Sequence, residues 1–225
     1  MNNIFIICGY GIPRDMARDE NYSRYLNVAF NTIYQEVTDR AVKQPLILFS
    51  GGPTDMHKPY RRTEGQVMTK YFKKLANRSA VKHATRLWRY VADTKSLSTL
   101  ENLLLARAVI RRRRITAGRL IVFCETSREE KLRVLSKKIF GKKFARRVVA
   151  IDFDTSPSRY VDPQLINKKE KTEIRHALWA LRSPANLRAH HRVFVEKVAY
   201  LRQIGPSGHH QAIHQWWRKK IQEMQ

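Results

Sequence analysis

The sequence predicts a doubly wound α/β fold, with a mostly parallel five-stranded sheet and helices on both faces, followed by an all-helical C-terminal extension. Through residue 153, short apolar runs alternate with longer stretches of helical periodicity. Such alternation is typical of parallel strands joined by right-handed crossovers. Beyond residue 155 only helical patterns remain. We therefore expect a Rossmann-like α/β domain at 1–155 and a helical extension at 156–225.

The strands are predicted from short runs that are apolar or that alternate, and the helices from apolar residues three or four apart. The expected strands are 3–8, 45–49, 86–92, 120–124 and 148–153. The helices of the α/β domain are expected at 21–40, 63–75, 100–113 and 128–140, and those of the extension at 166–182, 187–203 and 209–223. If the strand order is 3-2-1-4-5, Cys8 and Cys124 lie on neighbouring strands.

The amino-acid composition limits which partners and which cellular compartment we expect. The chain has 225 residues and a formal net charge of +25, from 44 Lys and Arg against 19 Asp and Glu. This charge allows nucleic acid, an anionic membrane or an anionic small ligand as partner, or simply a basic solvated surface. The two cysteines form neither a disulfide framework nor a zinc motif. With no apolar run near the roughly 18 residues of a membrane span and no signal-peptide pattern, we expect a cytoplasmic protein.

Each of the first four predicted strands ends in a suggestive loop, and parallel topology gathers such loops in one crevice. The string after 45–49 lacks the lysine of a phosphate-binding loop, so its glycines are expected to let the backbone approach a ligand. Arg14 and Arg128 are candidate cations for an anionic group. The candidate ligand-binding residues are Gly9, Gly11, Arg14, Ser50, Gly51, Gly52, Ser96, Thr99, Asn102, Thr126, Ser127 and Arg133.

Two carboxylates are candidate catalytic groups. Glu64 and Glu101 each fall in the first turn of a predicted helix, over the same crevice. First-turn acids also cap helices, so both residues have a structural alternative. Two carboxylates at one site can hold a metal or transfer protons. Metal binding by the His210 and His214 pair is less favoured, because no carboxylate or cysteine lies close by in sequence.

The order of these motifs resembles the YdcF/SanA/ElyC-like family, a bacterial domain of largely undefined function. The resemblance covers about residues 3–153 and is most specific at Ser96-x-x-Thr99-x-Glu101-Asn102. It implies a Rossmann-like sheet, a polar site at the strand ends, an association with the cell envelope, and a nucleotide-type ligand such as S-adenosylmethionine. Thr126, Ser127 and Arg133 match the family's last motif, but Glu130 stands where that motif has a histidine, which puts imidazole chemistry in doubt.

The leading expectation is a protein that binds a small anionic or nucleotide-type ligand, and that acts on it as a hydrolase or group transferase if it is an enzyme. The backbone amides of the glycine loops and of the helix that starts near Thr99 would hold the anionic group. The alternative is a basic nucleic-acid-binding module without catalysis, in which Trp216 and Trp217 stack on bases. A tryptophan on a terminal helix more often anchors that helix to the core, and we expect this of the Trp216 and Trp217 pair.

Overall fold

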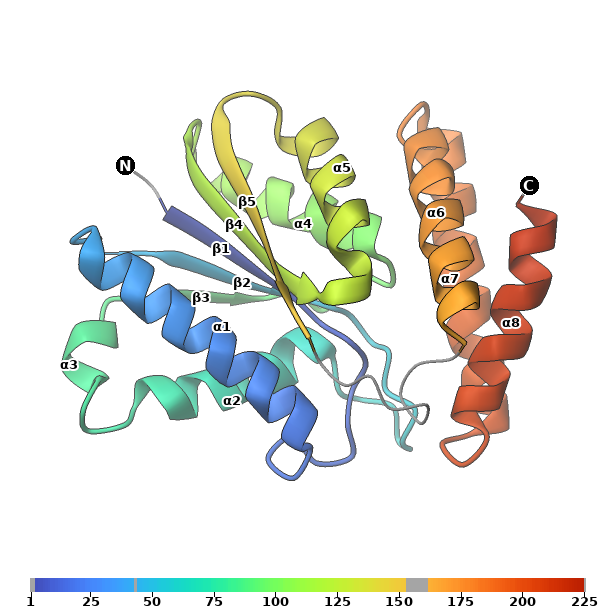
Figure 1. The fold of residues 1–225 in the computed structure, drawn as a ribbon, viewed down its shortest axis with the longest axis horizontal. Coiled ribbons are helices and arrows are strands. Elements are labelled where there is room, and N and C mark those ends of the chain that lie inside the picture. The colour runs from blue at the N-terminus through green and yellow to red at the C-terminus, as the bar shows by residue number, and fades with distance from the viewer. Residues whose placement is uncertain (1–2, 43, 153–161, 225) are drawn as a thin grey trace.

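A computed structural model of the chain, which describes residues 3–42, 44–152 and 162–224, contains a five-stranded parallel sheet of order β3-β2-β1-β4-β5 (Figure 1). The strands are β1 (Asn3–Cys8), β2 (Leu46–Ser50), β3 (Arg89–Ala92), β4 (Gly118–Glu125) and β5 (Phe144–Ile151). The predicted fold class is confirmed, and the strand order is the one considered above as a condition for Cys8 and Cys124. Cys8 and Cys124 lie on the neighbouring strands β1 and β4, as that order requires.

Helices cover both faces of the sheet, which explains why the central strands are apolar without alternation. On one face, Phe5 and Ile7 of β1 join a cluster with α1 (Glu20–Asp39) and α2 (Glu64–Ala76). On the other, Ile4 and Ile6 join a cluster with α4 (Thr99–Arg112) and α5 (Glu129–Phe140). Successive strand residues point to opposite faces. A strand buried on both sides therefore reads as a continuous hydrophobic run.

The C-terminal extension is a group of three helices beside the sheet (Figure 1), α6 (Pro163–Ala180), α7 (Pro184–Ile204) and α8 (His209–Glu223). Ala177 and Ala180 of α6 belong to the same cluster as α4 and α5, so the extension shares a core with the sheet domain. Trp217 of α8 is 2% exposed and packs with Leu165 and Phe194. It therefore anchors α8, as expected.

The structure departs from the predicted elements mainly at their ends. The third strand begins at Arg89 rather than 86, because Trp88 turns into the core whereas Leu87 is 46% exposed. A short helix, α3 (Lys82–Thr85), and a 3-10 turn, η1 (Thr126–Arg128), were not predicted. The fifth strand begins at Phe144, ahead of the predicted 148. Residue 153 and the predicted boundary at 155/156 lie outside the described residues.

None of the described helices combines the length and the apolar composition needed to cross a membrane.

Candidate functional site

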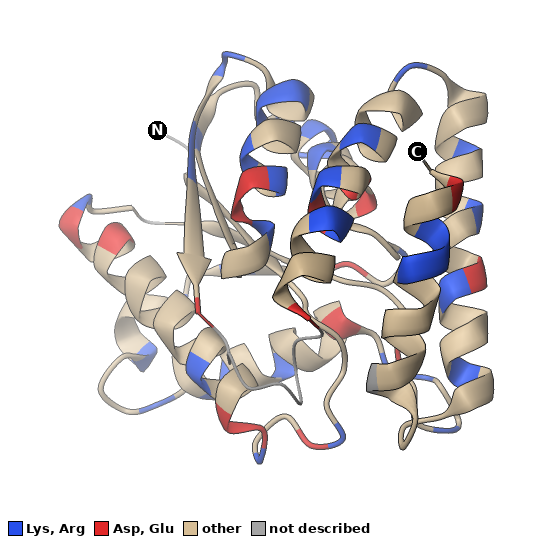
Figure 2. Cartoon of the chain, turned by 45° about the vertical axis from the view of Figure 1, so that its right-hand side comes forward, with Lys and Arg blue, Asp and Glu red and all other residues tan. Residues whose placement is uncertain are grey.

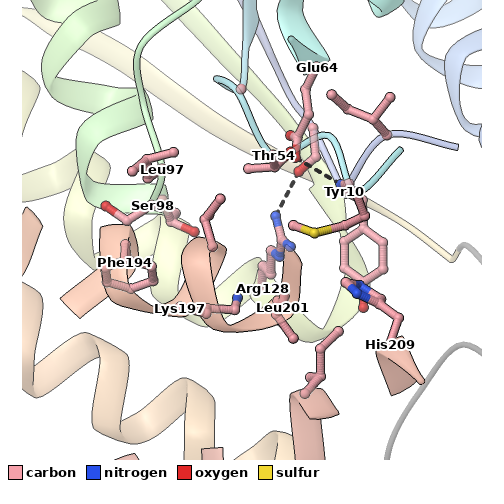
Figure 3. Close-up of a pocket in the computed structure, with 18 of the residues that line it drawn as sticks. Tyr10, Thr54, Glu64, Leu97, Ser98, Arg128, Phe194, Lys197, Leu201 and His209 are labelled. Atoms are coloured by element: carbon pink, nitrogen blue, oxygen red, sulfur yellow. Dashed lines mark hydrogen bonds between the residues drawn. The ribbon is translucent and has the colours of Figure 1, made fainter. Parts of the chain in front are cut away.

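A pocket of about 670 Å³ opens where the parallel strands end, and its lining includes four loops and the C-terminal helices (Figure 3). The position is the one that doubly wound folds favour for ligands. The pocket brings together candidate residues that lie as far apart in the sequence as Gly9 and Ser127. Of the candidate residues, Gly9, Gly11, Gly51, Glu64, Ser96, Thr99, Asn102 and Ser127 line it.

Glu64 is the buried carboxylate of this pocket. Thr63 caps the start of α2 by accepting from the Gln66 N–H, which places Glu64 in the first turn. The Glu64 carboxylate accepts from the Gly11 N–H at 3.0 Å and from the Thr54 hydroxyl. Burial raises the pKa of Glu64 above its ordinary value, although these hydrogen bonds and nearby Arg128 oppose the shift. The Glu64 carboxyl is therefore protonated more readily than the carboxyl of a surface glutamate.

The glycines of the first two loops make room for protein atoms. A side chain at Gly9 or Gly51 would collide with the Glu64 side chain, and one at Gly52 would meet the backbone carbonyl of Ser96. Gly52 itself is not among the residues that line the pocket. These loops therefore fit around Glu64 and the loop after β3, in addition to facing the pocket.

The amides of the first loop are already bonded within the chain. Gly9 N–H donates to the Ser50 carbonyl, Tyr10 N–H to the Tyr22 hydroxyl, and Gly11 N–H to Glu64. The expectation that glycine-loop amides hold an anionic ligand therefore lacks support at this loop. Satisfied donors gain little from a ligand unless the loop rearranges.

The polar residues around the start of α4 hold one another. The Ser96 hydroxyl lies against both the Asp93 carboxylate and the Asn102 side-chain oxygen. Asn102 also contacts the thiol of Cys8 at the end of β1. Ser96, Asn102 and Thr99 are all buried, and all three line the pocket. The network fixes the wall of the pocket and leaves these side chains limited capacity for a ligand.

Glu101, the second candidate catalytic residue, is not among the residues that line the pocket. Its carboxylate accepts from the Leu97 N–H at 2.7 Å and lies 2.8 Å from the His191 ring on α7. Ser98 completes the helix cap by accepting from the Glu101 N–H. This geometry favours the capping alternative for Glu101 and adds a tether to α7.

Four other candidates also lie off the pocket. Ser50 is buried at the end of β2, and Thr126 is exposed in η1. Arg133 extends from the exposed side of α5, where it pairs with Glu129. Arg14 lines a second, adjoining hollow. Arg133 is displaced because position 133 falls on the helix face turned to solvent.

Arg128 reaches the pocket from the end of η1, as Figure 3 shows. Its guanidinium donates to the Gly9 carbonyl at 2.8 Å and lies 4.4 Å from the centre of the Tyr10 ring. Among the described residues, no carboxylate lies within ion-pair distance of it. The sequence identified Arg128 as a candidate cation, and the structure places it in the pocket wall.

Lys131 is a buried lysine in the same wall, held by two glutamates of α6. Its ammonium pairs with Glu170 at 2.6 Å and with Glu173. Lys169 also contacts both glutamates. The neighbouring ammonium groups keep the pKa of Glu173 well below its ordinary value despite its burial. These four charges form a compensated network, which we call the α5–α6 ion cluster.

Lys197 of α7 is the cation that this cluster does not compensate. It points into the pocket near Arg128 (Figure 3) and lies 5.2 Å from the centre of the Trp217 ring. Among the described residues no carboxylate lies within 4 Å of its ammonium. Burial lowers its pKa to about 8, and the positive charges of Lys169, Arg128 and Lys131 act in the same direction, against Glu173.

Sequence analysis missed Lys131, Lys169, Glu170, Glu173 and Lys197. In the sequence they are ordinary members of charged helices. One signal was present: Lys131 falls on the apolar face of the α5 pattern, beside Leu132 and Leu135. A lysine at a predicted core position requires a partner. The identity of that partner, 42 residues away, is not encoded locally.

The described residues contain no cluster of three or more His, Cys, Asp or Glu side chains suited to a metal ion. The side chain of His210, one of the weaker metal candidates, lies outside the described residues. The pocket offers Lys197, Arg128 and the buried Glu64 carboxyl, a set suited to binding an anion and to proton transfer.

Comparison with known proteins returned no matching family model, no matching curated protein and no matching solved structure.

Proposed function

We propose that the chain binds a small anionic ligand of the nucleotide type in this pocket, with a phosphate group between Lys197 and Arg128. The observation that carries the proposal is the electrostatic environment of Lys197. Its ammonium faces the pocket, no carboxylate of the described residues lies at ion-pair distance from it, and its pKa is lowered to about 8. A ligand anion would supply the missing countercharge.

A phosphate suits the two cations better than a single carboxylate does. A guanidinium fork matches the oxygens of a phosphate, and an ammonium adds a point charge. The pocket is mixed in sign, since Asp19 and Glu20 line another part of it. Carboxylate oxygens there are acceptors for ribose hydroxyls or a ligand amino group. The resemblance to the YdcF-like family makes S-adenosylmethionine a second nucleotide-type probe.

If the chain is an enzyme, Glu64 is the group we propose for proton transfer. Its pKa is raised by burial, and a general base works best when its pKa lies near the operating pH. Hydrolysis or group transfer at the bound phosphate is the matching reaction class. Glu101 has no part in this proposal, because its carboxylate lies outside the pocket lining.

The second candidate function is nucleic-acid binding, which the net charge of +25 favours. Lys and Arg are spread over the sheet domain and the C-terminal helices rather than gathered in one tail (Figure 2). Trp217 is buried, so it offers no stacking face to a base. Such binding would weaken steeply with salt as counterions are released.

The test is a thermal-shift titration with inorganic phosphate, adenosine monophosphate and S-adenosylmethionine. A ligand that binds the native state raises Tm with concentration. We expect adenosine monophosphate to raise the Tm of the wild type and to leave Lys197→Met unshifted. Lys219→Met, which removes a charge from the exposed face of α8, is the matched control and keeps the shift.

Equal shifts for the wild type and Lys197→Met would overturn the site. No shift with any probe, together with salt-sensitive retention of RNA or DNA, would favour the second candidate instead.

A further inference from the structure

A second hollow, with a volume of about 660 Å³, adjoins the pocket. The two hollows share Met56, His57 and Pro206 in their linings. The second is formed by the loop between β2 and α2, by Arg14, and by the end of α7. A ligand long enough to pass these three residues would reach both hollows.

The floor of the second hollow is built by paired charges. Arg62 makes two hydrogen bonds to the Asp55 carboxylate, at 2.9 and 2.8 Å, and Asp55 is buried. The same guanidinium donates to the carbonyls of Pro13 and Arg14 at 3.0 Å. Arg62 thus joins the loop after β1 to the loop after β2, and its donors are committed within the chain.

Arg202 of α7 completes the floor. It donates to the Asp55 carbonyl at 3.0 Å and to the Pro53 carbonyl at 2.7 Å, and its guanidinium lies 4.8 Å from the centre of the Tyr60 ring. These contacts fix the loop on the helical extension. A rigid floor lowers the ordering cost of binding a ligand.

Three further cations of this hollow are not committed. Arg14, Lys58 and Arg61 line it and are exposed. Among the described residues, none of the three side chains has a hydrogen bond or an ion pair. Asp55 is the only carboxylate among the described lining residues, and Arg62 already neutralises it. The second hollow therefore carries an excess of positive charge.

We propose that the ligand carries two phosphate groups separated by a nucleoside, with the second phosphate bound by Arg14, Lys58 and Arg61. This inference rests on the proposed function, because the first phosphate is the one assigned to Lys197 and Arg128. It narrows the ligand from a mononucleotide to a dinucleotide-type molecule. Guanidinium groups are well matched to phosphate oxygens.

The test compares adenosine monophosphate with the 5′-phosphorylated dinucleotide pApA by isothermal titration calorimetry at fixed ionic strength. We expect pApA to bind the wild type at least tenfold more tightly. The variant Arg14→Ser/Arg61→Ser should lose that gain and keep its affinity for adenosine monophosphate. The charge-matched control Arg218→Ser/Lys219→Ser, on the exposed part of α8, should behave as the wild type.

The outcomes separate the two proposals. If adenosine monophosphate binds but pApA gains nothing, or the double variant retains the gain, the second phosphate site is wrong and the proposed function stands. If neither probe binds, the proposed function fails as well. If the control variant loses the gain as much as the test variant does, general attraction to the basic surface explains the binding, and the inference is overturned.

Discussion

The Glu64 side chain occupies the space that a side chain at Gly9 would fill. Gly9 is the first residue after β1, and Glu64 is the first residue of α2. The Glu64 carboxylate also accepts a hydrogen bond from the N–H of Gly11, two residues further along the same loop. The glycines at these strand ends are therefore required in part by a carboxylate of the chain itself.

We expect Gly9→Ala to destabilise the protein through this overlap. Forcing a methyl group into a filled site costs about 1–3 kcal/mol. In a Glu64→Ala background the nearest carboxylate atoms are absent, so the same substitution should cost less. Urea unfolding of the four proteins in a double-mutant cycle measures the coupling between the two positions.

The matched control is Gly208→Ala. An added Cβ there meets the γ2 methyl of Ile204, a side chain that is 46% exposed and can move into solvent, so we expect a smaller loss of stability than at Gly9. Additive effects of Gly9→Ala and Glu64→Ala would show that Glu64 is not what Gly9 accommodates.

The sheet could be predicted because its information is local. Runs such as 3–8 and 46–50 are buried on both faces, and their length and spacing define parallel strands and crossovers. Strand ends were less certain. Leu87 and Trp88 have similar hydrophobicity, and only the packing of Trp88 against Phe30 and Phe72 decides that it lies in the core.

The candidate site was predicted in part, for the same reason. Parallel topology places the ends of all the strands at one edge, so it was possible to predict that the loops with Gly9, Gly51 and Ser96 lie close together. The positions of the cationic side chains could not be predicted in this way. Lys131, Glu173 and Lys197 come together because α6 packs against α5 and α7 packs against α6. Neither the direction nor the rotation of α6 and α7 follows from their periodicity.

Lys131→Met should be strongly destabilising, since it leaves Glu170 and Glu173 buried beside one remaining lysine. Removing one partner of a buried ion pair costs about 3–5 kcal/mol. We expect the lower end of this range, because Lys169 still contacts both glutamates. Chemical denaturation at pH 7 measures the loss.

Arg133→Met is the control for that substitution, on the same helix but in an exposed pair with Glu129. It should cost less than about 1 kcal/mol. Adding Glu173→Gln to Lys131→Met should recover part of the loss. If the two single variants are equally stable, the α5–α6 ion cluster does not act as a buried pair.

Because His190 is buried, we expect the folded protein to lose stability in mild acid. Its ring lies 3.0 Å from the Ser98 hydroxyl and 2.9 Å from the His176 ring. Burial, reinforced by the charge of His176, lowers its pKa from 6.5 to about 4. Between these values the unfolded chain binds a proton that the native state does not, so stability falls as pH falls from about 6.5 to about 4.

His190→Phe should flatten this part of the stability curve, and NMR titration of the imidazole should show a neutral ring down to about pH 4. His176, whose own pKa is lowered by burial, remains in both proteins and leaves a residual slope of the same sign in the variant. A His190 ring that titrates near 6.5 in the native state would contradict the prediction.

Lys197 should lower the stability of the free protein at pH 7, although it is required for ligand binding in the proposed function. Its pKa falls from 10.5 to about 8 on folding. The native state therefore disfavours the charged form, and stability rises with pH between about 8 and 10.5 as the native lysine loses its proton first. We expect Lys197→Met, which retains most of the apolar stem, to be more stable than the wild type at pH 7. The gain should be on the order of 1–3 kcal/mol and should shrink toward zero near pH 10.5.

Urea unfolding at several pH values measures the difference in stability between the two proteins. The titrations of Tyr10 and Tyr90 cancel in this difference, because both proteins contain these residues. Lys219→Met should show no such dependence on pH. A variant that is less stable than the wild type at pH 7, with a difference that stays constant up to pH 10, would mean that Lys197 is stabilised by a partner in the native state rather than left for a ligand.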